Sequence, residues 1–442
     1  MSPRLRTLVL PLGGFCLVAA ASAAPSLQLL STTPDWTVVE VREGAGLGGH
    51  VSTAGDVNGD GFDDVLVSAP SWDDFVDPFE GKVFLYLGSA SGLSLTPAWT
   101  FEGDKPDVQL GIATSAGDVN ADGFGDVIVA APEYNPDWLS GRVWLFLGSS
   151  TGLSATPAWT REGGLDTYFA TSVAAVGDVN GDGFDDVMVG APGQDFHRFD
   201  EGGAFLFLGS ASGLSTIADQ VFKGSEELSA FGVAVAGAGD VDGDGFDDVL
   251  IGSTGYDGAQ EDQGRVYVFR GSPRGLRPHP VAALEIGGEI LFGNGLGRAG
   301  DINADGLDDF LVSGGHPAGV QRVYVYMGSK AARNSQPALV LQPDQPQFLS
   351  FGTAGDVNGD GFGDVIVSAP RQDDGLVFVH RGTAIGLDSV PLQTLAATQA
   401  GEYFGGSVSA AGDVNGDGFD DVIVGAPVYN PGGRALVFHG GQ

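Results

Sequence analysis

The stretch Asp56-Val57-Asn58-Gly59-Asp60-Gly61-Phe62-Asp63-Asp64 returns six more times along the chain with little change. The later copies begin at Asp118, Asp178, Asp240, Asp301, Asp356 and Asp413, at steps of 55 to 62 residues. Self-similarity at such a period is the signature of a repeat architecture. The 442 residues are therefore predicted to form one array of seven similar units.

Short apolar segments surround each copy in the same order. A Leu-Gly or Phe-Gly pair precedes most copies, and two apolar runs follow, such as residues 65–70 and 83–87. A weaker element comes last, as in Pro97-Ala98-Trp99-Thr100. These runs are rich in Val, Phe and Tyr and end at Gly, Pro or Ser, which favours strands over helices. The two middle runs are apolar throughout, so both of their faces are expected to be buried.

Four short strands per repeat, covered on both sides by neighbouring copies, are typical of a propeller blade. A linear stack of repeats would need polar capping repeats at its ends. Instead, the last repeat stops near His439 without the Trp-containing element, and an orphan copy of that element lies at residues 33–37. We therefore predict an all-β fold, a seven-bladed β-propeller of four-stranded antiparallel blades. Residues 27 to about 43 are expected to complete the last blade and close the ring, which removes open sheet edges.

Each nine-residue loop carries the oxygen donors that Ca²⁺ prefers. Positions 1, 5 and 9 are always Asp, position 3 is Asn or Asp, and position 6 is always Gly, which permits a sharp turn. Side chains at positions 1, 3, 5 and 9, with the carbonyl of position 7, can converge on one ion. Zinc and copper are disfavoured because the loops hold neither Cys nor His, and Mg²⁺ is disfavoured by its tighter geometry.

The predicted ligands lie in seven loops, at residues 56–64, 118–126, 178–186, 240–248, 301–309, 356–364 and 413–421. Position 1 is Asp56, Asp118, Asp178, Asp240, Asp301, Asp356 and Asp413; position 3 is Asn58, Asn120, Asn180, Asp242, Asn303, Asn358 and Asn415. Position 5 is Asp60, Asp122, Asp182, Asp244, Asp305, Asp360 and Asp417; position 7 is Phe62, Phe124, Phe184, Phe246, Leu307, Phe362 and Phe419. Position 9 is Asp64, Asp126, Asp186, Asp248, Asp309, Asp364 and Asp421.

A set of Asp-Gly hairpin turns with solvated acids is the alternative interpretation, and sevenfold repetition of one spacing argues against it. Carboxylates packed this closely repel one another without a cation, so up to seven Ca²⁺ ions are expected to be coupled to folding. Aspartates at position 8, such as Asp63, are expected to lie outside the ligand set.

The N-terminal residues 1–24 have the layout of a secretory signal peptide: Arg4 and Arg6, an apolar stretch, then Ala21-Ser22-Ala23. A buried N-terminal helix is the alternative. The single cysteine, Cys16, lies in this segment, so the mature propeller at residues 25–442 would have no disulfide. The net charge of −37 disfavours nucleic acid and anionic membranes as partners. We therefore expect a monomeric protein that is secreted or held at the cell surface and has no membrane span.

The combination of Phe-Gly, then Asp-x-Asn-x-Asp-Gly-x-x-Asp, then Gly-Ala-Pro resembles the FG-GAP repeats of the integrin α-subunit propeller and its bacterial relatives. The resemblance implies calcium loops between the first two strands of each blade, on the face opposite the ligand-binding one. This sequence departs from the pattern at Phe169-Ala170, at the displaced sixth repeat near Phe348, and in repeats four and five, which lack Gly-Ala-Pro. Dockerin and thrombospondin-type calcium arrays share the loop but differ in spacing or in the segment that follows.

The expected function is binding or adhesion to an extracellular protein or glycan, with the ligand face on the connections between second and third strands. Those connections carry Trp72, Tyr134, Trp138, Phe196, His197 and Tyr256. Packing of these rings onto their own loops is the alternative. An enzyme or lectin-like accessory domain acting on polysaccharide is the second functional hypothesis. It is disfavoured because the six histidines occupy unrelated repeat positions and no nucleophile-elbow or His-Glu-x-x-His motif occurs, so no catalytic residue or organic cofactor is predicted.

Overall fold

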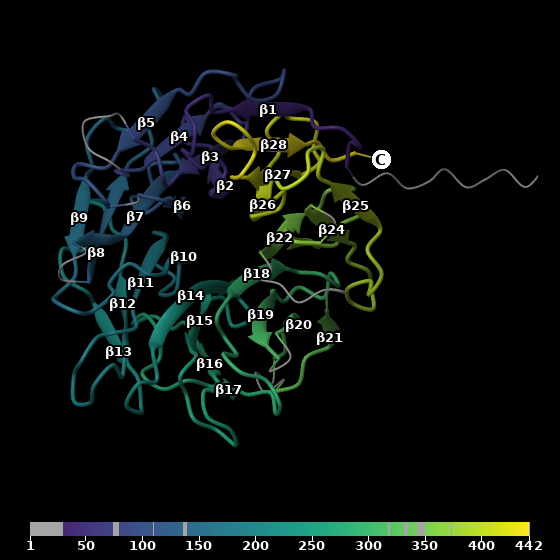
Figure 1. Ribbon diagram of the computed structural model, residues 1–442. Coiled ribbons are helices and arrows are strands. Elements are labelled where there is room, and N and C mark those ends of the chain that lie inside the picture. Colours follow the sequence, from purple (N-terminus) through teal and green to yellow (C-terminus); the bar gives the residue numbers. More distant parts are fainter. Residues whose placement is uncertain are drawn as a thin grey trace, which may run out of the picture.

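The computed structural model describes residues 30–73, 79–108, 110–135, 139–316, 319–330, 335–342, 350–372 and 374–441. The predicted signal peptide, Phe348 and Trp138 lie outside these residues. Within them the fold is all-β: 28 strands form seven separate four-stranded sheets, and no helix occurs among them. Figure 1 shows the sheets arranged as blades around a common centre. The predicted seven-bladed propeller is confirmed.

Each blade takes its strands in chain order from the centre outwards, apart from the last. Blade 1 contains β2 (His50–Gly55), β3 (Asp64–Ala69), β4 (Lys82–Tyr86) and β5 (Trp99–Glu102). Blade 2 contains β6 (Ile112–Gly117), β7 (Asp126–Asn135), β8 (Ser140–Phe146) and β9 (Trp159–Glu162). Blade 3 contains β10 (Val173–Gly177), β11 (Asp186–Ala191), β12 (Gly203–Phe207) and β13 (Gln220–Lys223). Blade 4 contains β14 (Phe231–Gly239), β15 (Asp248–Ser253), β16 (Arg265–Phe269) and β17 (Ala282–Leu284).

The remaining blades follow the same plan. Blade 5 contains β18 (Leu296–Gly300), β19 (Asp309–Gly315), β20 (Gln321–Tyr326) and β21 (Leu339–Leu341). Blade 6 contains β22 (Phe351–Gly355), β23 (Asp364–Ala369), β24 (Leu376–His380) and β25 (Gln393–Ala396). Blade 7 contains β26 (Ser407–Gly412), β27 (Asp421–Ala426), β28 (Arg434–Phe438) and, at its outer edge, β1 (Trp36–Val39).

The chain ends close the ring as predicted. Strand β1 pairs antiparallel with β28, with Trp36 opposite Val437 and Val39 opposite Arg434. A bridge between Leu30 and Gly440 continues the contact towards the N-terminus. The strand itself is shorter than residues 27 to 43, because residues 40–43 leave the sheet as a bend and turn.

The apolar core consists of layers between adjacent blades. One cluster joins blades 1 and 2 and includes Leu66, Leu85 and Val129, and six similar clusters join the other neighbouring pairs. The second strand of blade 1, β3, is buried at every residue, as are its counterparts β11, β15, β23 and β27. Burial on both faces explains why these strands are apolar throughout rather than alternating.

Candidate metal centres

Each predicted loop joins the first and second strands of its blade and coils around its first aspartate. In blade 1, Asp56 accepts hydrogen bonds from the backbone N–H groups of Gly59 (2.7 Å), Asp60 (3.1 Å) and Gly61 (2.8 Å). The bonds from positions 5 and 6 recur in all seven loops. Position 6 is Gly because its φ of +89° in Gly61 lies in the left-handed region.

The ninth residue ties the loop to the rest of its blade. Asp64 is fully buried and accepts a hydrogen bond from Val57 N–H (3.0 Å) with one oxygen and from Gly88 N–H (2.8 Å) with the other. Burial, with the nearby charges of Asp56 and Asp60, raises its pKa to about 7. The same causes raise the pKa to about 7 or 8 in the six equivalent residues, Asp126, Asp186, Asp248, Asp309, Asp364 and Asp421.

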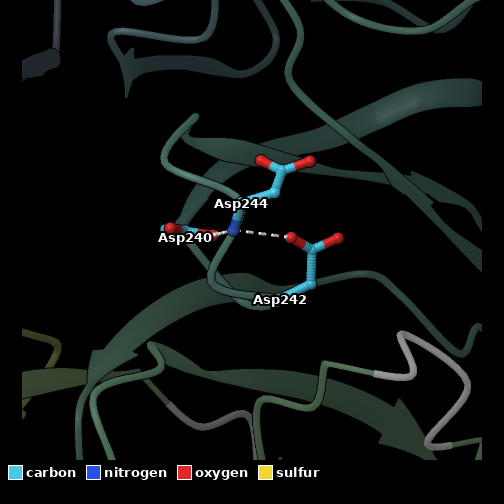
Figure 2. A group of neighbouring side chains, drawn as sticks. All are labelled: Asp240, Asp242 and Asp244. Carbon is cyan, nitrogen blue, oxygen red and sulfur yellow. Dashed lines mark hydrogen bonds between the residues drawn. The ribbon is translucent and has the colours of Figure 1, made fainter.

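The donor set of each loop fits a hard divalent cation. Figure 2 shows the fourth loop, where one carboxylate oxygen from each of Asp240, Asp242 and Asp244 lies within 4.8 Å of the others. The three side chains offer oxygen donors, which is the chemistry that Ca²⁺ prefers, and the guanidinium of Arg270 also pairs with Asp242 at this loop. Burial, and to a smaller extent the charges of Asp242 and Asp244, raises the pKa of the position-9 residue Asp248, and a bound cation would favour its ionised form. The group of three aspartates does not include Asp248, whose two oxygens accept the N–H groups of Val241 and Gly271. Among the described residues, the structure thus brings together three of the four predicted side-chain ligands of this loop.

Hydrogen bonds between blades connect the seven loops into a closed circle, a feature that the sequence did not reveal. The backbone N–H at position 8 of each loop donates to the carbonyl at position 1 of the preceding loop, as Gly125 does to Asp56 (2.8 Å). In five loops an aspartate side chain at position 8 also accepts the N–H of that same position-1 residue; these are Asp63, Asp185, Asp247, Asp308 and Asp420. Position 8 therefore links blades rather than only adding surface charge.

Position 7 also reaches the neighbouring loop. A Cβ added to Gly59 would lie 2.7 Å from the ring of Phe124, so the position-7 side chain of loop 2 covers the position-4 glycine of loop 1. Phe246, Phe419 and Phe62 cover Gly181, Gly359 and Gly416 in the same way. This contact leaves room for glycine alone, and Gly59 also has a φ of +71°.

The predicted ligand-face aromatics are largely covered by cations. Tyr134 is 3% exposed, accepts a hydrogen bond from Arg142 (2.6 Å) and donates to Asp104 (3.2 Å). Trp72 is half-buried, with the guanidinium of Arg42 4.0 Å from its ring centroid.

Similar packing occurs in blades 3 and 4. The half-buried rings of Phe196 and Tyr256 contact Lys223 (4.3 Å) and Arg265 (3.4 Å). His197 is exposed. Tyr134 lies within strand β7, and its ring packs on Trp144 of strand β8, with ring centroids 5.5 Å apart.

Other apolar side chains are exposed on the connections opposite the metal loops. They are Phe79, Leu139, Tyr168, Phe199, Leu228 and Leu291, each between 40% and 57% exposed. Five of them have φ between +47° and +59°, a region that bulky residues rarely adopt; the exception is Phe199. The sequence contained a signal for this backbone conformation at two of these positions. Tyr168 and Leu291 directly precede Phe169 and Phe292, and the equivalent position of the first repeat is a glycine, Gly46.

Comparison with known families agrees with this architecture. The FG-GAP repeat pattern matches residues 48–86, 110–146, 169–207, 231–269, 348–380 and 404–438. This chain belongs to the FG-GAP repeat family. The fifth blade of this FG-GAP protein lies outside the matched residues, although it has four strands like the others. Its departures, including the missing Gly-Ala-Pro, therefore leave the blade intact.

Similar proteins include integrin α-subunits. The chain is 28% identical over 245 residues to integrin alpha-5 of Xenopus laevis, covering 52% of this chain and 22% of the relative. It is 33% identical over 180 residues to integrin alpha-3 of Cricetulus griseus, covering 39% of this chain and 17% of the relative. The matches thus span about a fifth of those proteins.

Among solved structures, BBS1N in complex with ARL6DN, soaked with mercury, superimposes with a TM-score of 0.54 at 11% identity. The superposition covers 92% of this chain and 96% of that one. At this identity the likeness concerns the fold alone.

Proposed function

We propose that this FG-GAP protein is an exported, calcium-stabilised binding module that uses the face opposite its metal loops to hold an extracellular protein. The observation that carries the proposal is the set of exposed apolar side chains on that face, several held in left-handed backbone. Backbone strain of this kind costs about 1–3 kcal/mol per residue and gathers at binding sites. Similarity to integrin α-subunits supports adhesion as the general role.

Export and calcium belong to the same proposal. Residues 1–24 carry the signal-peptide pattern, and no helix in the described part of the chain is long and apolar enough to cross a membrane. The oxygen donors and raised pKa values of the loops support Ca²⁺ at up to seven sites, held by the predicted residues.

The role of the ions would be structural. Each loop is bonded to its blade through position 9 and to the preceding loop through position 8. An ion that fixes one loop therefore also fixes a joint between two blades. Calcium would act on ligand binding through the integrity of the ring.

A chelator experiment tests the calcium part. The mature chain should melt at least about 10 °C lower in EGTA than in 2 mM CaCl₂, because ligands that bind only the folded state stabilise it by mass action. Mg²⁺ should restore the loss only in part. Equal melting temperatures with and without chelator would refute the stabilising role of the loops.

Binding arrays test the ligand face. The purified chain is applied to arrays of extracellular proteins and of glycans, with Ca²⁺ present. The double variant Phe199→Ser/Leu228→Ser should lose at least about tenfold in affinity for whatever protein is retained, since each side chain would leave a buried apolar contact. The control is Ile385→Ser/Val390→Ser, which changes two exposed apolar residues of a connection on the metal-loop side. Equal loss in both variants, or retention by glycans alone, would refute the protein-binding face.

A polysaccharide-acting enzyme remains the second hypothesis from the sequence. The exposed His197 donates its backbone N–H to Glu201 (2.5 Å). No observation in the described residues favours the enzyme.

A further inference from the structure

The fourth loop differs from the others at position 3. In loops 1, 2, 3 and 5, the side-chain amide of the position-3 asparagine donates to the position-5 carboxylate, as Asn58 does to Asp60 (3.0 Å). The fourth loop has Asp242 at this position, which has no proton to donate when ionised. Asp242 and Asp244 would therefore repel each other, and Asp242 is nearly buried, with 2% of its side chain exposed.

Two arginines offset the negative charges of Asp242 and Asp244. The guanidinium of Arg270 forms an ion pair with Asp242, and Arg277 lies 3.5 Å from Asp244. Asp242 keeps the local contact found elsewhere, since its other oxygen accepts the N–H of Asp244 (3.1 Å). The oxygen that takes the place of the amide nitrogen is thus the one that Arg270 holds.

The position of Arg270 can be compared between blades. It directly precedes Gly271, whose N–H donates to the position-9 residue Asp248. The glycines with the same role in blades 1 to 3 follow Leu87, Leu147 and Leu208. The position is thus leucine in blades 1 to 3, arginine in blades 4 and 6, and Met327 and His439 in blades 5 and 7.

Blade 6 provides a natural control. Arg381 occupies the equivalent position before Gly382, but the sixth loop has the neutral Asn358 at position 3. Arg381 pairs with Asp388, which lies outside the loop (3.4 Å). Arginine at this position thus reaches into the loop only where an acid is present.

We propose that Arg270 is a built-in counter-ion of the fourth loop that competes with calcium for Asp242, making this loop the weakest calcium site of the ring. The inference rests on the proposed binding of calcium. The oxygen of Asp242 that matches the asparagine oxygen of the other loops stays available to an ion, but that ion would lie beside the largely buried guanidinium that holds the second oxygen. A fixed positive charge also repels the dication, and burial limits its screening by salt.

Calcium binding to the whole mature chain, measured by equilibrium dialysis with isothermal titration calorimetry, tests this. The wild type should show one weak site beside a tighter class. Arg270→Leu, which restores the residue of blades 1 to 3, should strengthen the weak site by at least about tenfold, equivalent to about 1.4 kcal/mol. Arg381→Leu, the matched control, should leave the isotherm unchanged, and Asp240→Asn should remove the weak site only.

A second variant covers the case in which Arg270→Leu fails to fold because Asp242 loses its partner. Asp242→Asn/Arg270→Leu rebuilds the arrangement of blades 1 to 3 and should merge the weak site with the tighter class. An unchanged weak site in these variants, or loss of a tight site in Asp240→Asn, would overturn the role of Arg270 while leaving calcium binding intact. Absence of calcium binding by the wild type would instead refute the proposed function.

Discussion

At the scale of single residues, position 4 of the loops decides how much backbone strain a loop contains. Five loops have glycine there, and loops 2 and 5 have Ala121 and Ala304 with φ of +53° and +55°. Alanine in this region is strained, whereas glycine adopts it freely. The second and fifth loops therefore store strain that the other five avoid.

Replacement of Ala121 by glycine should stabilise the protein by about 0.5–1 kcal/mol, because relief of the left-handed strain exceeds the added freedom of the unfolded chain. Denaturation in saturating calcium measures the change. The reverse variant, Gly181→Ala, should cost more than 1 kcal/mol, on the order of the penalty for overpacking, because its Cβ would lie 2.7 Å from the ring of Phe246. If position 4 controls the strain, the two substitutions must change the free energy of unfolding in opposite directions.

The buried position-9 aspartates predict how pH acts on the protein. Their folded-state pKa is raised from 3.8 to about 7 or 8, so between pH 4 and 7 the calcium-free folded state binds more protons than the unfolded state. Stability of the chelated protein should therefore be greatest at acidic pH and fall as pH rises through about 7.

Saturating calcium should remove this dependence, since the ion replaces the proton and leaves position 9 ionised in the folded state, as it is in the unfolded state above about pH 4. Its affinity should fall on acidification below pH 7, by up to about tenfold per pH unit for each loop. Melting curves with EGTA and with CaCl₂ at pH 5, 6, 7 and 8 would check both slopes. An equally steep fall of stability with pH in EGTA and in saturating CaCl₂ would contradict the assignment of position 9 as a ligand.

At the scale of elements, the first residue of the outer strand joins a blade to the next in five of the seven blades. Trp159 packs on Phe207, with ring centroids 5.0 Å apart, and donates its indole N–H to the carbonyl of Ser215 (3.0 Å). Trp36 and Trp99 make the same bond to Ser94 and Ser154. In blades 3 and 6, Gln220 and Gln393 keep the bond through an amide.

Trp159→Ala should cost about 3–5 kcal/mol, the range for truncating a large buried aromatic residue. Trp159→Gln should recover about 1 kcal/mol of this loss, because the amide can donate to Ser215 as Gln220 does to Leu276. Urea titration in calcium would measure both. The hydrogen-bonded contact would be refuted if glutamine and alanine were equally destabilising.

These elements also show which structural features the sequence patterns could predict. Strand type, loop position and the apolar second strand were predictable because each depends on residues adjacent in the chain. The exposure of Leu139 beside Tyr168, and the burial of Tyr134 under Arg142, were not. An aromatic residue in a loop has the same sequence appearance whether its ring faces solvent or a guanidinium from the neighbouring strand.

At the scale of the whole molecule, closure of the ring depends on one short strand. Strand β1 covers the edge of β28, and Trp36 contacts the next blade through Tyr86 and Ser94. Without β1, the seventh blade would expose an unpaired edge, which promotes association between chains.

A chain that begins at residue 44 should therefore melt at lower temperature and form dimers or aggregates detectable by light scattering. A synthetic peptide of residues 27–43, added in excess, should restore the monomer and most of the melting temperature, since the missing strand is supplied by the peptide. A truncated chain that stays monomeric with unchanged stability would show that closure contributes little.

The sequence by itself determined the number of blades, the positions of the seven loops and the exchange of the outer strand between the chain ends. Each of these depends on a local sequence pattern that repeats every 55 to 62 residues, so the interpretation of one copy applies to the others. Only the tertiary structure decided how copies meet. The circle of bonds from position 8 to position 1, the covering of Gly59 by Phe124 and the pairing of Asp242 with Arg270 all join different strands or blades. They follow from the packing of neighbours in space, which no single repeat contains.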